Sequence, residues 1–424
     1  PPLPELKNPK PPPPPLPKSK VSKPTSPSFA KLDDPQSVLS ARASSPNKLD
    51  INKEPDLKSQ QDTVSIKDHQ NFALAGVKSR SLDIYEKIDQ VGEGTYGKVY
   101  KARNRHTGII VALKRIRMES EKEGFPVTAM REIKLLQSMN HNHIIKIHEI
   151  AVNKGSVYMV LDYMDYDLTG FLAYPKLELT HAHIKCLMKQ ILEGIHYLHV
   201  KNVLHRDIKG SNILMNRKGE IKLADFGLAR IHERNRLKDY TNRVITLWYR
   251  PPELLLGATK YGAEVDIWSV GCIMMELFLR KPIFQGSDEI SQLEQIYRIM
   301  GVPNKADWPS VVDLPWFALV RPKDKSGRKF RESFKKTMTP AALDLAEWLL
   351  TMDPSKRPVA KEALNHPYFT TEEPEACPIQ KLPSIDGDWH EYESKQRKKK
   401  QALDQANRNQ SHASSRTSKE SHPA

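Results

Sequence analysis

The stretch HRDIKGSNILMNRKGEIKLADFG, residues 205–227, decides the fold. It contains Asp207 and Asn212 in the spacing D-x-x-x-x-N, and it ends in an Asp-Phe-Gly that begins at Asp225. Between them, two short apolar runs flank a Lys-Gly pair, which predicts a small β-hairpin. Because a hairpin brings its two ends together, we expect Asn212 and Asp225 to lie side by side.

These residue types suit the transfer of a phosphoryl group from ATP. Asn212 and Asp225 would hold Mg²⁺, Asp207 would face the substrate hydroxyl, and Lys209 would reach the transferred phosphate. Asp207, Lys209 and Asn212 are therefore the catalytic candidates. A lone Asp-Phe-Gly is usually an ordinary turn, but its position behind H-R-D-x-x-x-x-N favours the catalytic interpretation.

The combined motifs resemble those of the eukaryotic protein kinases over residues 82–369. The resemblance implies an α+β, bilobal fold. Residues 82–162 would form a small N-lobe, an antiparallel β-sheet with one helix, and residues 165–369 a mainly helical C-lobe, with ATP between the two. Residues 1–80 and 370–424 would be largely disordered flanking segments.

A glycine-rich run, Gly-Glu-Gly-Thr-Tyr-Gly, occupies residues 92–97. Such a run could also open a dinucleotide-binding unit, but a helix should then follow it. Residues 98–102 are β-prone instead, which favours a hairpin lying over the phosphates. The kinase resemblance assigns ATP binding to Val91, Gly92, Glu93, Gly94, Thr95, Tyr96, Gly97, Lys98, Val99, Ala112, Lys114, Glu132, Asp162, Met164 and Asp167.

Lys114 ends an apolar strand, where a buried ammonium group requires a partner. Glu132 lies within the apolar stripe of a helix predicted over residues 126–136. A glutamate at the edge of such a stripe is often exposed and idle. With Lys114 otherwise unpaired, we expect an ion pair that would hold the α- and β-phosphates of ATP.

The run Pro-Val-Thr-Ala-Met-Arg-Glu, residues 126–132, resembles the cyclin-binding helix of cyclin-dependent kinases in a variant form. That resemblance implies a cyclin as partner. Thr241 lies where this family is phosphorylated, and a phosphate there would be bound by three arginines. These are Arg131, Arg206 and Arg230. Thr95 and Tyr96 are possible inhibitory phosphosites, although we favour a covering role for Tyr96.

Val244 and Ile245 should shape the pocket for the residue after the phosphoacceptor and select proline. Three runs, at residues 163–168, 206–212 and 248–257, resemble those of transcriptional cyclin-dependent kinases, and the motif His-Glu-Tyr-Glu at residues 390–393 strengthens the resemblance. Together they most resemble the catalytic subunits of fungal kinases that act on the C-terminal heptad repeats of RNA polymerase II. A cell-cycle kinase is the alternative within the family. A non-catalytic kinase fold is the alternative outside it, but it would require loss of Lys114, Asp207, Asn212 or Asp225.

Composition sets broader bounds. The chain has 424 residues and a formal net charge of +15, which suggests acidic partners. Its three cysteines are scattered, which fits a reducing compartment. Direct nucleic-acid binding is not required, and no run predicts a membrane span. The basic run at residues 395–400 is either a solvated surface or a nuclear localisation signal, and for this family we expect a nuclear protein. The proline-rich start is either an SH3- or WW-type ligand or a tether.

Overall fold

The computed structural model describes residues 79–94, 97–118, 125–153, 155–232, 239–320, 327–379, 389–391 and 395. All of them belong to one compact unit, Asp62–Ala424. The proline-rich start, Thr95, Tyr96 and all of the basic run beyond Lys395 lie outside the described residues. No helix in the described part of the chain combines the length and apolarity needed to cross a membrane.

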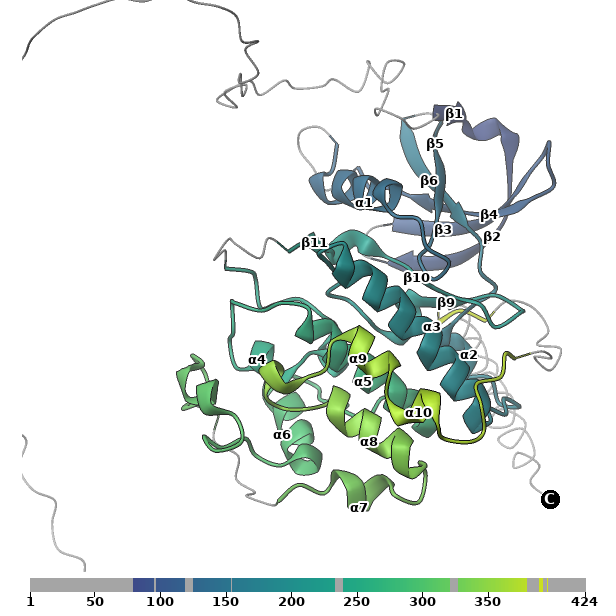
Figure 1. The fold of residues 1–424 in the computed structure, drawn as a ribbon. Coiled ribbons are helices and arrows are strands. Elements are labelled where there is room, and N and C mark those ends of the chain that lie inside the picture. The colour runs from purple at the N-terminus through teal and green to yellow at the C-terminus, as the bar shows by residue number, and fades with distance from the viewer. Residues whose placement is uncertain are drawn as a thin grey trace, which may run out of the picture. The chain divides into compact units, whose positions relative to one another are not determined.

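The N-lobe is built on a six-stranded sheet in the order β1-β5-β6-β4-β3-β2 (Figure 1). Neighbouring strands are antiparallel except at one edge, where β1 runs parallel to β5. The prediction of an antiparallel sheet is thus confirmed for five strands, while the parallel edge strand was not foreseen. The bounds are β1 Ser79–Ser81, β2 Tyr85–Gly94, β3 Gly97–Asn104, β4 Ile110–Arg115, β5 Ile147–Asn153 and β6 Ser156–Asp162.

Alternation of side chains along β4 explains how this sheet serves the site. Leu113 points to a small apolar core on the outer face, where it is buried with Val111 and Tyr158. Ala112 and Lys114 therefore point to the opposite face, toward the C-lobe, because successive side chains of a strand alternate. The strand thereby carries a lysine to the face of the sheet that looks toward the C-lobe.

Helix α1, Val127–Ser138, covers the N-lobe beside the sheet (Figure 1). It buries Ile133, Leu135 and Leu136, as its apolar periodicity predicts. Glu132 is buried among them with only 2% of its surface exposed. A charged group at that depth requires a partner, which the site provides.

The C-lobe is mainly helical and is organised around α5, Glu264–Leu279 (Figure 1). Its side chains are buried on nearly all faces, which explains a sequence that is apolar all round. Helix α3, His181–Val200, begins at the N-cap Thr180 and packs on α5 and α9. The remaining helices are α2 Leu168–Leu172, α4 Pro252–Leu255, α6 Glu289–Met300, α7 Phe330–Phe334, α8 Pro340–Leu349, α9 Ala360–Leu364 and α10 Pro367–Thr370. The bilobal α+β fold is confirmed.

Two small sheets lie between the lobes and carry the site. The predicted hairpin is formed by β9, Ile213–Met215, and β10, Ile221–Leu223, and β7, Tyr166–Asp167, pairs with β9. A second pair joins β8, Val203–Leu204, to β11, Arg230–Ile231. Since β8 precedes the catalytic loop and β11 follows the Asp-Phe-Gly, this pairing holds the two motifs together.

Behind the site, Arg357 and Glu253 form a buried pair. Both guanidinium Nη atoms of Arg357 donate to the Glu253 carboxylate, at 2.6 and 2.7 Å. The same guanidinium donates to the backbone carbonyls of Thr351, Met352 and Glu264. A charge pair with its remaining donors satisfied is stable when buried. Here it fixes the end of the activation segment, which runs from Gly227 to Glu253, to the C-lobe.

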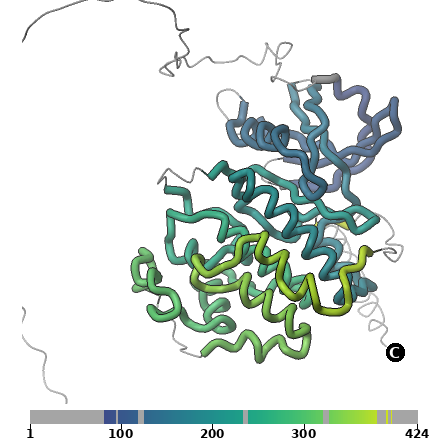
Figure 2. The backbone as a smooth tube through the Cα atoms, in the orientation of Figure 1, coloured from purple at the N-terminus to yellow at the C-terminus, as the bar shows by residue number. Residues whose placement is uncertain are grey.

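Beyond α10, the structure describes residues 371–379 and 389–391 (Figure 2). The prediction of a mostly disordered extension did not foresee a defined structure for these residues. Lys185 on α3 is 2% exposed and its ammonium donates to the carbonyls of Glu372 and Pro374. Ile379 is buried against the β9–β10 turn. Buried apolar contacts and a satisfied lysine offset the entropy of ordering these residues.

Candidate active site

The catalytic loop is anchored from below by Asp266 on α5. This carboxylate is fully buried and accepts the backbone N–H groups of His205 and Arg206, at 3.0 and 2.9 Å. His199 contacts the same carboxylate at 3.0 Å. Arg206 has a left-handed backbone conformation, with φ of 63°. The two backbone hydrogen bonds that Asp266 accepts stabilise this conformation. The loop is therefore fixed by the centre of the C-lobe.

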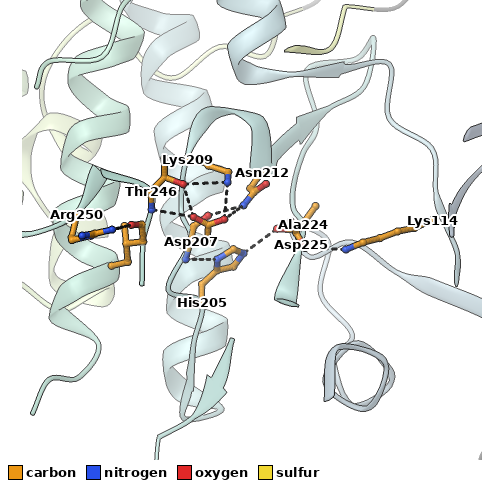
Figure 3. A network of polar contacts seen from close by, with 10 residues as sticks. Lys114, His205, Asp207, Lys209, Asn212, Ala224, Asp225, Thr246 and Arg250 are labelled. Atoms are coloured by element: carbon orange, nitrogen blue, oxygen red, sulfur yellow. Dashed lines mark hydrogen bonds and ion pairs between the residues drawn. The ribbon is translucent and has the colours of Figure 1, made fainter. Parts of the chain in front are cut away.

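His205 connects this loop to the Asp-Phe-Gly (Figure 3). Its Nε2 lies 3.1 Å from the carbonyl of Ala224, while its Nδ1 accepts the N–H of Asp207 at 3.3 Å. These partners require a proton on Nε2 alone. Burial lowers the pKa of His205, against the charges of nearby aspartates, which is consistent with a neutral ring. His205 is thus a structural link between the two motifs.

Asp207 lies at the centre of a polar network (Figure 3). Its Oδ2 is 2.8 Å from the ammonium of Lys209 and 2.9 Å from the Asn212 amide nitrogen. Its Oδ1 accepts the hydroxyl of Thr246 at 2.9 Å. The three predicted catalytic residues are therefore brought together. Thr246, from the activation segment, joins them, although no sequence motif pointed to this residue.

Asn212 and Asp225 both border the main cleft, as the hairpin predicts. The amide nitrogen of Asn212 donates to Asp207, so its oxygen is turned away and is available to a cation. Amide and carboxylate oxygens are ligands that Mg²⁺ prefers, and the set fits that ion. Among the described residues no three His, Cys, Asp or Glu side chains form a metal cluster. Further ligands would therefore come from phosphates and water.

Lys114 bridges the N-lobe to the Asp-Phe-Gly. Its ammonium lies 2.8 Å from Glu132. It also lies 2.9 Å from Asp225 (Figure 3). Burial alone would lower the pKa of Lys114, but the charges of Asp225 and Glu132 outweigh it and raise that pKa. Burial likewise opposes ionisation of Asp225, whose pKa the Lys114 charge nevertheless lowers. The predicted Lys114–Glu132 pair is confirmed in geometry.

The cleft between the lobes has a volume of about 550 Å³. Predicted site residues that line it are Val91, Gly92, Glu93, Asp167, Asp207, Lys209, Asn212, Asp225, Val244 and Ile245. Lys98 and Val99 lie on β3 beside it, and Ala112 lies on β4. Gly97 has a φ of 139°, and a Cβ there would lie 1.9 Å from the Arg115 carbonyl oxygen, so only glycine fits. Gly94 pairs with it in the β2–β3 hairpin.

The C-terminal segment, defined here as residues 389–391, also borders this cleft. His390 Nε2 lies 3.0 Å from the carbonyl oxygen of Met164, in residues 162–164, the hinge between the two lobes. The N–H of Glu391 donates to Asp167 at 2.6 Å, and Gly170 donates to the other oxygen at 2.7 Å. Burial raises the pKa of Asp167 to about 7, although both bonds lower it. Asp167, a predicted ATP-binding residue, is thus hydrogen-bonded to the C-terminal segment.

In the sequence, the His-Glu of this segment is only a family signature, and no pattern predicts its place in the site. An available signal was Trp389, an isolated large apolar residue in a polar tail. In the structure its ring meets the Tyr174 ring edge to face, with 5.0 Å between the centroids. Its backbone N–H donates to the backbone carbonyl of Asp165. Asp162, at the other end of the hinge, turns its side chain to His148 at 2.8 Å.

The activation segment places Thr241 near one predicted arginine. The phenol of Tyr261 donates to the Thr241 carbonyl at 2.8 Å and accepts from Arg206 at 3.0 Å. Thr241 itself is exposed, as a phosphorylation site requires. Arg131 lies on α1 and Arg230 on β11, and their binding of a phosphate remains a prediction.

Ile245 has a backbone conformation rare for a β-branched residue, with φ of 67°. Its carbonyl accepts two hydrogen bonds from Arg250, from Nε at 3.1 Å and Nη2 at 3.0 Å (Figure 3). Val244 is buried beside it. A carbonyl occupied in this way is withheld from a peptide lying in the cleft.

Comparison with known proteins agrees with this geometry. The family model described as the protein kinase domain matches residues 85–369. The CTD kinase subunit alpha of Schizosaccharomyces pombe is 58% identical over 316 residues, which cover 74% of this chain and 53% of that protein. The protein of the same name from Saccharomyces cerevisiae is 50% identical, over 75% of this chain and 60% of its own length. The chain thus spans little more than half of these relatives.

A solved structure described as the yeast RNA Pol II CTD kinase CTDK-1 complex is similar in fold. It aligns with a TM-score of 0.67 and 48% identity, covering 72% of this chain and 98% of the compared chain. Residues 85–369, which the family model matches, contain the catalytic loop, the Asp-Phe-Gly, the Lys114–Glu132 pair and the activation segment. The chain belongs to the protein kinase family.

Proposed function

We propose that this chain is an ATP-dependent serine/threonine kinase that acts with a cyclin on Ser-Pro and Thr-Pro sites. Its proposed substrate is the heptad-repeat C-terminal domain of RNA polymerase II, in the nucleus. The names of the CTD kinase relatives support the substrate, and the kinase fold supports the reaction. Contacts of the substrate-facing residues support the preference for proline.

Asp207 would orient the acceptor hydroxyl and take its proton. Its contacts with Asn212, Lys209 and Thr246, which hold both carboxylate oxygens, support this role. Lys209 would then neutralise charge on the transferred group. Asn212 and Asp225 would hold Mg²⁺, which when bound with ATP screens the negative charge of the phosphates. Lys114, fixed by Glu132, would orient the α- and β-phosphates.

The observation that carries proline selection is the Ile245 carbonyl, which Arg250 occupies. A substrate residue with an N–H after the acceptor would bury a donor without a partner, at a cost of roughly 1–3 kcal/mol. Proline has no N–H and avoids this cost. The enzyme should therefore favour proline at that position by about tenfold or more.

The test is a pair of peptides that differ only in Pro or Ala after one acceptor serine. They are assayed with the full chain bound to a cyclin and phosphorylated at Thr241. Arg250→Lys should lower the Pro/Ala ratio of kcat/KM, because lysine cannot make both bonds to Ile245. Arg298→Lys, on the exposed side of α6, is the matched control. A wild-type ratio near one would remove the proline-directed proposal and weaken the polymerase substrate with it.

A further inference from the structure

Two of the three cysteines of the chain are far apart in sequence but are brought together by the fold. Cys186 is half-buried on α3, and Cys377 is exposed in the strap, which is defined here as residues 371–379. The third cysteine, Cys272, is buried on α5 with 1% of its surface exposed. Neither Cys186 nor Cys377 takes part in the chemistry described above.

A shared hydrogen-bond acceptor shows how close Cys186 and Cys377 are. The backbone N–H of Cys377 donates to the carbonyl of Ala182 at 3.2 Å. In an α-helix the same carbonyl accepts the N–H four residues further on, which is that of Cys186. Two N–H groups that converge on one oxygen have nitrogen atoms at most about 6 Å apart. That spacing agrees with a disulfide, which joins Cα atoms about 4.4–6.8 Å apart.

The two side chains are also near each other. The Cα–Cβ bonds of a helix tilt toward its N-terminus, so the Cys186 thiol leans toward the turn that contains Ala182. Burial raises the pKa of the Cys186 thiol, a hydrogen bond from Gln190 lowers it, and the negative charge of Cys377 raises it again. Because water screens charges near the surface, such an effect of one thiol on another requires a short distance.

Among the described residues, each of the two thiols makes one weak hydrogen bond. The Cys377 Sγ donates to the carbonyl of Pro378 at 3.5 Å, and the Cys186 Sγ accepts from the Gln190 amide at 3.6 Å. Sulfur is a weak donor and a weak acceptor, so little is lost when either side chain turns. The exposed Cys377 thiol can therefore turn toward Cys186 by rotation about its Cα–Cβ bond.

The strap lies against the hairpin that joins the catalytic loop to the Asp-Phe-Gly. Ile379 is buried on Gly219, in the turn between β9 and β10. Gln190, one turn beyond Cys186 on α3, donates to the carbonyl of the same Gly219 at 3.0 Å. A covalent bond between Cys186 and Cys377 would thus fix the strap to α3 beside this hairpin.

We propose that Cys186 and Cys377 form a reversible disulfide under oxidising conditions, which fixes the strap to α3. The oxidant is hydrogen peroxide, which converts the exposed Cys377 thiol to a sulfenic acid and is itself reduced to water. The Cys186 sulfur then attacks the sulfenic sulfur. The S–S bond forms, the S–O bond breaks, and hydroxide leaves with the Cys186 proton as a second water molecule.

The same bond is reversed by thiols. Two molecules of glutathione return both cysteines to the thiol form and leave as glutathione disulfide. In a reducing compartment the two thiols are therefore free at rest, and the bond forms only during exposure to peroxide. While it lasts, the strap stays on α3 even when the hydrogen bond from Cys377 to Ala182 opens.

The test treats the full chain with hydrogen peroxide and maps disulfides by mass spectrometry of peptides prepared without reductant. We expect the peptide that contains Cys186 to be joined to the peptide that contains Cys377, and dithiothreitol to separate them. Hydrogen–deuterium exchange of the backbone amides of the strap is measured on the same samples. It should be about tenfold slower in the oxidised protein, because the disulfide limits local opening.

Cys186→Ser and Cys377→Ser should each abolish the cross-link and make the exchange of the strap insensitive to peroxide. Cys272→Ala, which removes the third cysteine, is the matched control and should keep both effects. Since Cys377 is exposed, its variant tests the disulfide even if Cys186→Ser fails to fold. Oxidation of Cys377 without a cross-link to Cys186, or cross-links only between two copies of the chain, would overturn the disulfide. A cross-link that leaves the exchange unchanged would overturn the fixing of the strap.

Discussion

The catalytic loop and the C-terminal segment border the same cleft, but they are held there in different ways. The loop is fixed at its base by Asp266, which is fully buried and accepts two backbone N–H groups. The segment lies at the edge of the cleft and is held by Trp389, His390 and the N–H of Glu391. One region is part of the folded core, and the other is attached to it.

This difference predicts different kinetic roles. In the proposed function the loop residues face the acceptor hydroxyl, so changes there should lower kcat. The segment contacts the hinge carbonyl of Met164 and Asp167, so changes there should act on nucleotide binding. A mutation in either region that moves the wrong parameter would break the comparison.

Asp207→Asn should have the largest effect. The amide cannot accept a proton, so kcat should fall by roughly 10²- to 10⁴-fold, while ATP affinity should stay close to that of the wild type. The measurement is single-turnover phosphorylation together with nucleotide titration. Asp313→Asn, at an exposed position of the C-lobe, should leave both unchanged. Activity above a few per cent of wild type would show that Asp207 is not the catalytic base.

Thr241→Ala tests whether the loop is controlled through Arg206. A phosphate at Thr241 would gain charge-assisted hydrogen bonds near Arg206, which the Tyr261 phenol already links to the Thr241 carbonyl. Without it we expect kcat lower by roughly 10- to 100-fold, with cyclin binding retained. Rates of the variant and of phosphorylated wild type are compared directly. Equal rates would show that Thr241 is not the switch.

The sequence predicted the loop well because its chemistry is encoded by local spacing. Asp207 and Asn212 lie in one loop, and a single short hairpin separates them from Asp225. The motif therefore also specifies the geometry. The Lys114–Glu132 pair could be predicted because a buried charge requires a partner. In these cases a local pattern and an energetic requirement led to the same residues.

The C-terminal segment could not be predicted in this way. Glu391 and Asp167 are far apart in sequence, and their contact depends on how the chain returns after α10. The bond uses a backbone N–H, which carries no residue signature. The role of Thr246 was missed for a similar reason, since a threonine hydroxyl has many possible partners. Its bond to Asp207 appears only when the activation segment is placed.

Gly170→Ala should release the segment without touching the loop. A Cβ at this position would lie 2.3 Å from the carbonyl oxygen of Trp389 and 2.7 Å from the His390 carbonyl carbon. Alanine favours helix, so α2 itself should remain folded. Loss of the segment's hydrogen bonds should raise KM for ATP about fivefold and change kcat little.

Gly327→Ala is the control, because a Cβ there meets no atom within 4 Å. Trp389→Ala, which removes the ring contact with Tyr174, should raise KM in the same way. The double variant with Gly170→Ala should add little, since both changes release the same segment. A fall in kcat with unchanged KM for ATP would mean that the segment acts on the loop, and the contrast between the two regions would fail.

The smallest effect concerns the proton on Asp167. Burial raises the pKa of this carboxyl from 3.8 to about 7 in the folded protein, so the native state binds a proton more tightly than the unfolded chain. The free energy of unfolding should therefore fall as pH rises between about 4 and 7 and level off above it. Asp225, whose pKa is lowered, contributes in the opposite direction and only below about pH 4.

Urea unfolding of wild type and Asp167→Asn isolates this contribution. Between pH 6 and pH 7 the wild type should lose about 1 kcal/mol relative to the variant. Gly170→Ala should reduce that loss, because release of Glu391 would expose Asp167 to water and bring its pKa toward the ordinary value. An identical pH dependence in Gly170→Ala and wild type would mean that the segment does not bury Asp167 in solution.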